Sequence, residues 1–258
     1  MGFWFGLFGC RLMIYLCGGL DKKDIENAGI VYGFMDGSLD FNPGNLTARK
    51  ELLKKTVHYS YEVEQSHGIN IAVLDEKFKE AAKDNYNVFD INNADGVFTK
   101  ERGIALCIRT ADCVPVLFAD INNTERVIGA VHCGWKGAYG GIIKNAKNIL
   151  TDEFKADIGG ILIIIGPSIC KKCYEVKEDF LNLFLAKDTL NKKFFDKTVN
   201  ENRIFFDLKG FIRNELISNG FSDKNIYDLN ICNFEDAGFF SYRRDKDGKR
   251  QVSFIAVL

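Results

Sequence analysis

The sequence predicts an α+β fold, a single domain with a mixed β-sheet core covered by helices, on three observations. Short apolar runs rich in β-branched residues, typical of strands, recur along the chain. Runs with helical spacing stand between them, but without the strict alternation of a doubly wound fold. Residues 21–258 contain no Pro/Gly/Ser-rich linker and no charge run, which favours one domain over that range.

Apolar runs bounded by turn residues indicate the strands. The middle of the chain is the richest in them, because three such runs follow one another with turns between them. Gly166-Pro167 ends a later run that is wholly apolar. The expected strands cover residues 30–34, 61–63, 69–74, 104–108, 114–119, 127–131, 161–165, 226–229 and 252–257.

Helical spacing of apolar residues and end signals predict five helices. Thr47 is a candidate N-cap for the first, and Gly220 closes the last. The longest carries Ile142, Ile143 and Ala146 at helical spacing, so one face of it is expected to be buried. The five helices cover residues 48–58, 76–84, 137–154, 175–185 and 208–219.

Residues 1–20 form a separate apolar and aromatic segment at the N-terminus. Arg11 is the single charge in this segment and divides the apolar run. A signal peptide carries its positive charges first, and a membrane span needs about 20 apolar residues without a charge at its middle. A buried strand or hairpin is therefore favoured over a targeting or membrane role.

Charge and cysteine content exclude several classes of protein. The 34 basic and 35 acidic residues are interspersed and the net charge is -1, so no basic stripe points to nucleic acid. Eight cysteines in a chain of 258 residues do not make a disulfide scaffold, and free thiols in a reducing compartment fit best. We therefore expect a cytoplasmic protein with no nucleic-acid or membrane partner. For the lone CxxC of Cys170 and Cys173, two unrelated loop thiols are favoured over a zinc or redox role.

One thiol and two imidazoles stand where strand-like runs meet turns. They belong to His67, Cys113 and His132, in a chain that has three histidines in all. Two imidazoles and a thiolate from three separate turns can hold a metal ion and leave one coordination position open, as in catalytic zinc sites. Their spacing matches no local metal motif, so a buried thiol with two hydrogen-bonded histidines is the alternative.

Asp112 and a group of arginines are the other candidates for chemistry. Asp112 precedes the thiol and could orient a ligand, act as a general acid or base, or accept backbone hydrogen bonds in a turn. Arg243, Arg244 and Arg250 could clamp a phosphate or carboxylate with paired hydrogen bonds. The alternative for the arginines is a solvated hairpin around Asp247-Gly248, which their spacing alone favours.

Several of these residues belong to seven short segments that carry a family resemblance. In chain order the segments are Gln65-Ser66-His67-Gly68, Ala94-Asp95-Gly96-Val97, Thr110-Ala111-Asp112-Cys113-Val114-Pro115, His132-Cys133-Gly134-Trp135-Lys136-Gly137, Gly166-Pro167-Ser168-Ile169, Cys173-Tyr174-Glu175-Val176 and Phe239-Phe240-Ser241-Tyr242-Arg243-Arg244-Asp245. In that order they resemble the YfiH-like family. Its members were long described as laccase-type polyphenol oxidoreductases and are now assigned as purine nucleoside phosphorylases.

The resemblance implies both a metal site and a reaction. The family's metal ligands fall on His67, Cys113 and His132, with zinc as the expected metal and copper as the alternative. The implied reaction is phosphorolysis of adenosine, inosine and S-methyl-5′-thioadenosine to free base and (methylthio)ribose 1-phosphate, with adenosine deaminase activity in the same pocket. We expect Asp112, Cys113 and Arg243 to take part in the chemistry. Gln65, Arg243 and Arg244 are expected to contact the substrate.

The chain departs from the family pattern in several segments, including His132-Cys133-Gly134-Trp135-Lys136-Gly137 and Gly248-Lys249-Arg250, and two rival functions stand beside the first. Phe34-Met35-Asp36-Gly37 lies where family members usually carry an Arg-Gly-Gly-type segment, so an anion-binding arginine is missing there. One rival is a copper-dependent polyphenol oxidase, against which three histidines weigh, because a laccase needs several copper centres. The other is a factor for peptidoglycan fidelity.

Overall fold

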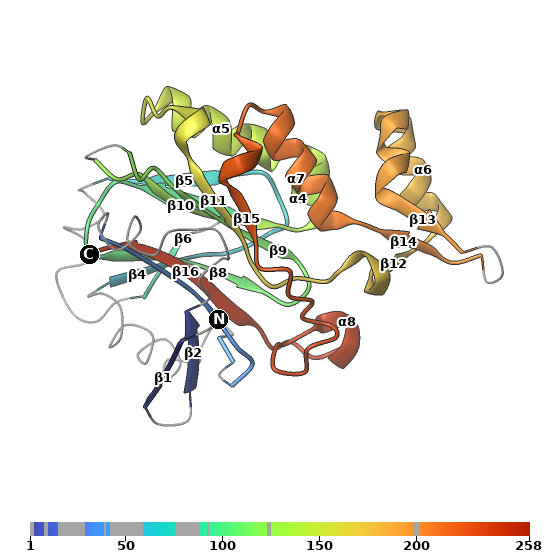
Figure 1. The fold of residues 1–258 in the computed structure, drawn as a ribbon, viewed down its shortest axis with the longest axis horizontal. Coiled ribbons are helices and arrows are strands. Elements are labelled where there is room, and N and C mark those ends of the chain that lie inside the picture. Colours follow the sequence, from blue (N-terminus) through green and yellow to red (C-terminus); the bar gives the residue numbers. More distant parts are fainter. Residues whose placement is uncertain are drawn as a thin grey trace.

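The computed structural model describes residues 3–7, 10–14, 29–38, 40–41, 59–75, 88–91, 93–122, 125–198 and 202–258. Within these ranges the chain forms two large mixed sheets that pack on each other, and helices cover the outer face of one of them (Figure 1). The predicted α+β fold with a mixed β-sheet core is confirmed.

The first sheet has seven strands and contains both ends of the described chain. Its N-terminal hairpin joins β1 to β2 in antiparallel register, and β2 continues onto β3. A strand or hairpin was the structure predicted for the apolar segment at residues 1–20. In sheet order the strands are β1 (Phe3–Leu7), β2 (Cys10–Ile14), β3 (Ile30–Met35), β16 (Gln251–Val257), β8 (Ile104–Thr110), β4 (Tyr59–Val63) and β6 (Val88–Ile91).

The second sheet has six strands and carries most of the site described below. Its centre is antiparallel, while the two outer pairs, β11 with β15 and β5 with β7, are parallel. In sheet order the strands are β15 (Ile226–Asp228), β11 (Leu162–Ile165), β9 (Val114–Ala119), β10 (Ile128–Cys133), β7 (Gly96–Thr99) and β5 (Ile71–Leu74).

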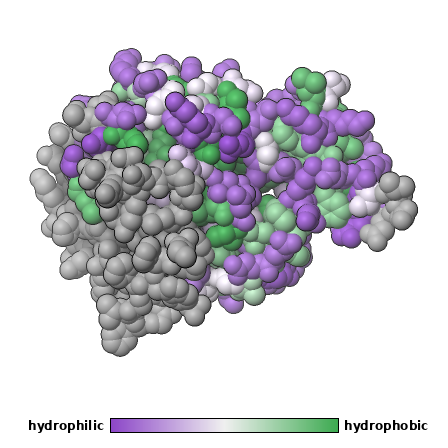
Figure 2. All heavy atoms as spheres, viewed as in Figure 1, coloured by the Kyte–Doolittle hydropathy of each residue, from purple (hydrophilic) through white to green (hydrophobic). Residues whose placement is uncertain are grey.

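Helices α4 (Trp135–Gly140), α5 (Ile142–Asp152) and α7 (Leu208–Ser218) lie over the second sheet (Figure 1). Beside them, α6 (Glu178–Lys187) packs on a small sheet of β12 (Glu175–Val176), β14 (Ile204–Phe206) and β13 (Phe195–Lys197). The short helix α8 (Tyr242–Asp245) stands near the last strand at the opposite side of the molecule from α5. In the space-filling view, hydrophilic side chains cover most of the described surface, with smaller apolar patches between them (Figure 2).

Alternation along the strands builds two core layers from one sheet. On β9, Val114, Val116 and Phe118 face the helices, whereas Leu117 and Ala119 face the first sheet. All five are buried, so each large side chain contributes on the order of 1.5–3 kcal/mol of transfer free energy. Because both faces of β9 are covered, its run is continuously apolar, which made it readable from sequence.

Two predicted helices differ from the observed ones. The run at 137–154 is two helices, α4 and α5, because Gly141 between them adopts φ +98°, which a helix cannot continue through. The run at 175–185 begins as strand β12, and its helix starts at Glu178. The helices predicted at 48–58 and 76–84 lie outside the described residues. Within the described ranges, no helix is long and apolar enough to cross a membrane.

Candidate metal centre and its cavity

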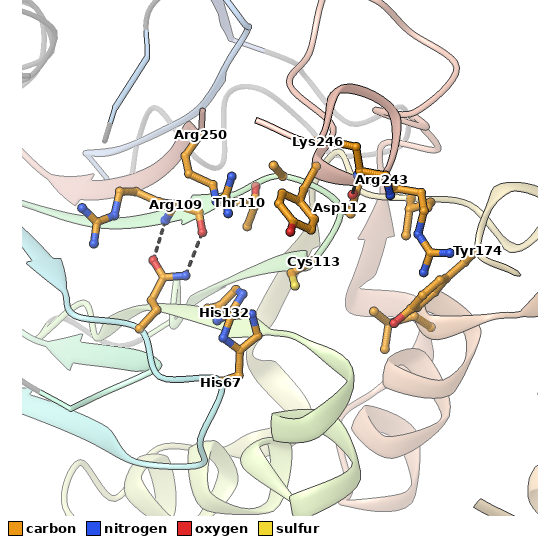
Figure 3. A pocket seen from close by; sticks show the side chains of 15 residues that line it. His67, Arg109, Thr110, Asp112, Cys113, His132, Tyr174, Arg243, Lys246 and Arg250 are labelled. Carbon is orange, nitrogen blue, oxygen red and sulfur yellow. Dashed lines mark hydrogen bonds between the residues drawn. The ribbon is translucent and has the colours of Figure 1, made fainter. Parts of the chain in front are cut away.

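His67, Cys113 and His132 meet at one end of the two sheets. His67 lies in the loop between β4 and β5, Cys113 in the turn between β8 and β9, and His132 on β10. One candidate ligand atom from each lies within 4.8 Å of the other two. The His67 and His132 rings stand edge to face with their centroids 4.9 Å apart, below Cys113 (Figure 3). The three residues that the sequence singled out are thus brought together.

Asp95 holds both histidines in place. Its carboxylate accepts a hydrogen bond from His132 Nδ1 at 2.8 Å, and also accepts the backbone N–H groups of His67 at 2.9 Å and Gly68 at 2.6 Å. The Asp95 side chain is fully buried. A carboxylate on one nitrogen of a histidine fixes the ring so that the other nitrogen points at a metal. Sequence reasoning had placed Asp95 only in a turn; its position in the segment Ala94-Asp95-Gly96-Val97 was the available signal.

The electrostatics of the centre favour a thiolate. Burial disfavours the thiolate and so raises the pKa of Cys113, but the neighbouring His132 and His67 outweigh this effect and lower the pKa to about 6. Burial also opposes the charged imidazole, yet the Cys113 thiolate and the Asp95 carboxylate raise the pKa of His132 to about 9. Cys113 and His132 thus each favour the charged form of the other.

The donor set and the space around it fit a metal ion. Two imidazoles and a thiolate suit zinc, and they also suit copper. Gly134 leaves the room they need, because a Cβ there would lie 3.0 Å from His67 Cδ2 and 3.3 Å from Cys113 Sγ. A metal ion bound here would take the place of the proton that His132 holds.

The centre opens into a cavity with a cationic side. The cavity has a volume of about 660 Å³. Arg243, Lys246 and Arg250 line it across from the histidines (Figure 3). Lys246 Nζ and Arg250 Cζ lie 5.8 Å and 5.6 Å from the centre of the Tyr242 ring. Cation–π interactions with this one ring therefore hold both positive charges near each other. Sequence reasoning had not singled out Lys246.

Asp112 fastens α8 to the turn that carries Cys113. It adopts φ +91°, and its Oδ1 accepts hydrogen bonds from Ser241 Oγ at 2.6 Å and Asn233 Nδ2 at 3.2 Å. Its Oδ2 accepts the backbone N–H of Arg243 at 2.6 Å. Both oxygens thus serve as acceptors, which suits an orienting role. The general acid or base role expected for Asp112 stays a prediction.

Arg243 presents its guanidinium to the cavity wall. Its Nη1 donates to the carbonyl of Glu175 at 2.9 Å, and its Cζ lies 5.2 Å from the centre of the Tyr174 ring. The bond to Glu175 takes one of the five N–H donors of the guanidinium, so donors remain for an anion. This geometry is compatible with the substrate contact predicted for Arg243.

The other two predicted substrate residues are engaged by the protein itself. Gln65 pairs with the backbone of Arg109, accepting at 2.8 Å and donating at 2.7 Å, while it lines the cavity. Arg244 donates to the carbonyls of Asn233 at 2.9 Å and Phe239 at 2.7 Å. It is outside the set of described residues that line the cavity. Contact of Gln65 and Arg244 with substrate stays a prediction.

A second group of thiols lies apart from this centre. Cys170 Sγ is 3.6 Å from Cys173 Sγ, and Cys232 and Glu235 complete a cluster in which the ligand atoms lie within 4.8 Å of one another. The interpretation of Cys170 and Cys173 as unrelated thiols is therefore wrong. It failed because Cys232 is distant in sequence and gave no local signal.

Comparison with known proteins places the chain in a family. The family model described as multi-copper polyphenol oxidoreductase laccase matches residues 39–258. The chain belongs to this family, the YfiH family. A Rickettsia conorii protein named purine nucleoside phosphorylase is 36% identical over 163 residues, which are 63% of this chain and 62% of that protein. The chain thus spans less than two thirds of the length of that relative.

Two further proteins share part of the sequence or the fold. A protein from an unknown prokaryotic organism, named adenosine deaminase, is 28% identical over 70% of this chain and 68% of its own length. The crystal structure of Bacillus licheniformis hypothetical protein YfiH superposes with a TM-score of 0.78, at 23% identity, over 97% of both chains. That structure shows the shared fold.

Proposed function

We propose that this YfiH-family chain is a zinc-dependent purine nucleoside phosphorylase with adenosine deaminase side activity. It would cleave adenosine, inosine and S-methyl-5′-thioadenosine with phosphate. The observation that carries the proposal is the meeting of His67, Cys113 and His132 at a cavity whose opposite side is cationic. The names of the relatives support the same reaction.

The cationic side suits the phosphate that phosphorolysis consumes. Arg243 is fixed by Glu175 and Tyr174, so its remaining donors are aimed without a further loss of rotamer freedom. Arg250 and Lys246 add charge beside it. These groups would hold phosphate against C1′ of the ribose as the C1′–N9 bond breaks, and would stabilise negative charge in the transition state. They also offer an anion site despite the missing Arg-Gly-Gly-type segment.

The rest of the cavity suits a nucleoside. A volume of about 660 Å³ lies within the usual range of small-molecule sites. Tyr174 and Tyr242 provide aromatic faces along its wall, and aromatic rings bind purines by stacking. The six described free cysteines agree with the reducing cytoplasm in which such nucleosides occur.

Two carboxylates of the chain orient the groups around the metal centre. A bound zinc ion would act as a Lewis acid and would lower the pKa of a bound water. Asp95 keeps the His132 ring turned so that its Nε2 faces Cys113. Asp112, next to Cys113 in the chain, holds the backbone of Arg243 through a hydrogen bond of 2.6 Å. Both reactions would therefore share one centre, and the phosphate side would matter for only one of them.

A copper-dependent polyphenol oxidase is the rival that the family description raises. Three histidines in the whole chain cannot ligate the several copper centres of a laccase, and two of these histidines already belong to one site. An oxidase with a single copper ion would not explain why Arg243, Lys246 and Arg250 line the opposite side of the cavity. The nucleoside reaction accounts for both halves of the site.

The test is product analysis with adenosine. Zinc-loaded protein is incubated with adenosine, with and without phosphate, and the products are separated, with a Cys113→Ala variant beside it. Adenine that requires both phosphate and Cys113 supports phosphorolysis. Inosine formed without phosphate supports the deaminase activity. The proposal would be overturned if the protein oxidised a phenol and formed neither adenine nor inosine. It would also be overturned if the protein turned over no nucleoside and its deletion altered the composition of the peptidoglycan.

A further inference from the structure

We infer that Cys170, Cys173, Cys232 and Glu235 form a second metal site, a structural zinc site that fastens together two walls of the cavity. The four residues come from two segments, 170–173 and 232–235, and contribute three thiols and one carboxylate. Four donors are enough to complete a tetrahedron, which is the usual arrangement of structural zinc.

The distances within the cluster suit that geometry. A tetrahedron with Zn–S bonds of about 2.3 Å has S···S edges of about 3.8 Å. Cys170 Sγ lies 3.6 Å from Cys173 Sγ and 3.8 Å from Glu235 Oε2. A disulfide would need the sulfurs at about 2.0 Å, so the thiols stand at the spacing of shared ligands.

Backbone turns present the two pairs of ligands. The C-x-x-C pair is folded by hydrogen bonds from the N–H groups of Cys173 and Tyr174 to the Cys170 carbonyl, at 3.0 Å and 3.1 Å. The C-x-x-E pair has a matching bond from Asp236 N–H to the Cys232 carbonyl at 2.9 Å. Two ligands three residues apart on a tight turn form the ligand unit of many zinc sites.

Interactions between the turns support the assignment. The Cys170 N–H donates to Cys232 Sγ at 3.3 Å, a bond that strengthens when the sulfur is a thiolate. Ser168 and Cys232 form a parallel β-bridge that sets the two turns side by side. Lys172 lies in the first turn beside the cluster, where its charge would partly offset the excess negative charge of three thiolates and a carboxylate on one divalent cation, while the neighbouring Lys171 pairs with Asp196 at 2.9 Å.

The site would stabilise the cavity through the residues that follow each ligand. Cys173 is followed by Tyr174 and Glu175, which position the Arg243 guanidinium. Cys232 is followed by Asn233, whose side chain donates to Asp112 Oδ1 at 3.2 Å. Zinc at the cluster would therefore join the Tyr174 wall to the Asp112 turn. The cluster also borders an open surface depression, which gives a metal ion a path of entry.

Zinc binding can be measured with the first centre disabled. The full chain carrying Cys113→Ala is stripped of metal under reducing conditions and titrated with zinc against a chromophoric chelator. One zinc per chain is expected. Adding Cys232→Ser should abolish this binding, and Glu235→Gln should weaken it by about 10-fold or more. Asp236→Asn removes a neighbouring charge outside the cluster and serves as the matched control, with unchanged affinity.

Glu235 is exposed, so its variant tests the site even where the cysteine variant fails to fold. The inference is overturned by three results: no zinc bound in the Cys113→Ala chain, affinity unchanged by both cluster variants, or iron in place of zinc in the purified protein. A Cys170–Cys173 disulfide found by peptide mass spectrometry in protein purified under reducing conditions would also overturn it.

A second readout concerns structure alone. Lys171 and Lys172 lie between two of the ligands, so zinc should protect them from trypsin. Metal-free Cys113→Ala protein should be cut there, and added zinc should prevent the cut. Equal cleavage with and without zinc contradicts a structural site, while protection that Glu235→Gln weakens agrees with it.

Discussion

The two clusters of metal-ligand side chains differ in how the fold assembles them. The first takes single residues from three separate loops or strands and faces a cavity of about 660 Å³. The second takes two pairs from two tight turns and borders an open surface depression. Three donors leave a coordination position for a substrate or water, whereas four do not. We therefore propose that the first cluster serves the reaction and that the second holds parts of the fold together.

The thiols of the two clusters also differ in charge environment. His132 and His67 lower the pKa of Cys113. Burial and the neighbouring Cys232 thiol raise the pKa of Cys170, and burial and Cys170 raise that of Cys173. The surroundings of Cys113 thus favour its thiolate, whereas those of Cys170 and Cys173 disfavour theirs.

Arg243→Ala separates phosphate binding from the metal chemistry. The variant loses hydrogen bonds to a charged ligand, so the KM for phosphate should rise by about 10- to 100-fold. Deamination of adenosine needs no phosphate and should change much less. Steady-state kinetics of both reactions check this. Equal loss of both activities would contradict the phosphate role.

Asp95→Asn should weaken the first cluster and spare the second. The amide cannot accept hydrogen bonds from His132 and the 67–68 turn as the carboxylate does, so zinc affinity should fall by about 10- to 100-fold. A competition titration that resolves two zinc ions per chain measures it. The second zinc serves as the internal control; a fall in both affinities would indicate general unfolding.

Alkylation of the metal-free protein tests the charge difference between the clusters. With a pKa of about 6, Cys113 is mostly thiolate at pH 6.5, and its reactivity should rise through pH 6 and then level off. A lower pKa costs intrinsic nucleophilicity, so the net advantage over an ordinary thiol at pH 6.5 is about 10-fold. Peptide mass spectrometry after iodoacetamide gives the profile. Cys173 and buried Cys133, whose pKa values are raised, should react only at higher pH.

Gly137→Ala is expected to have the smallest effect. Its Cβ would lie 2.6 Å from the backbone oxygen of Gly68, so the turn that carries His67 must move. The strain should cost about 1–3 kcal/mol of unfolding free energy, against a gain of about 1 kcal/mol in helix propensity. Denaturant unfolding measures the balance. Gly140→Ala, whose Cβ would meet side-chain rather than backbone atoms, at Ile69 Cγ2, is the control.

The sequence predicted most of the central fold, because its strands leave local apolar patterns. It also pointed to His67, Cys113 and His132, which the fold brings together. Strands such as β9 are covered on both faces and read as continuous apolar runs. Asp95 could not be assigned, since its role depends on a bond to His132 from a distant strand. The second cluster was missed for the same reason, because Cys232 is distant in sequence from the CxxC and is brought to it by the fold. The break at Gly141 was missed because its neighbours continue the helical spacing.

Adenine formation and zinc content, measured together in Cys113→Ala and Cys232→Ser, test the division of roles most directly. Each variant should keep one zinc per chain. Cys113→Ala should form no adenine, whereas Cys232→Ser should still form it at saturating substrate, with a raised KM. Adenine formation that survives in Cys113→Ala and disappears in folded Cys232→Ser would contradict the account and place the reaction at the second cluster.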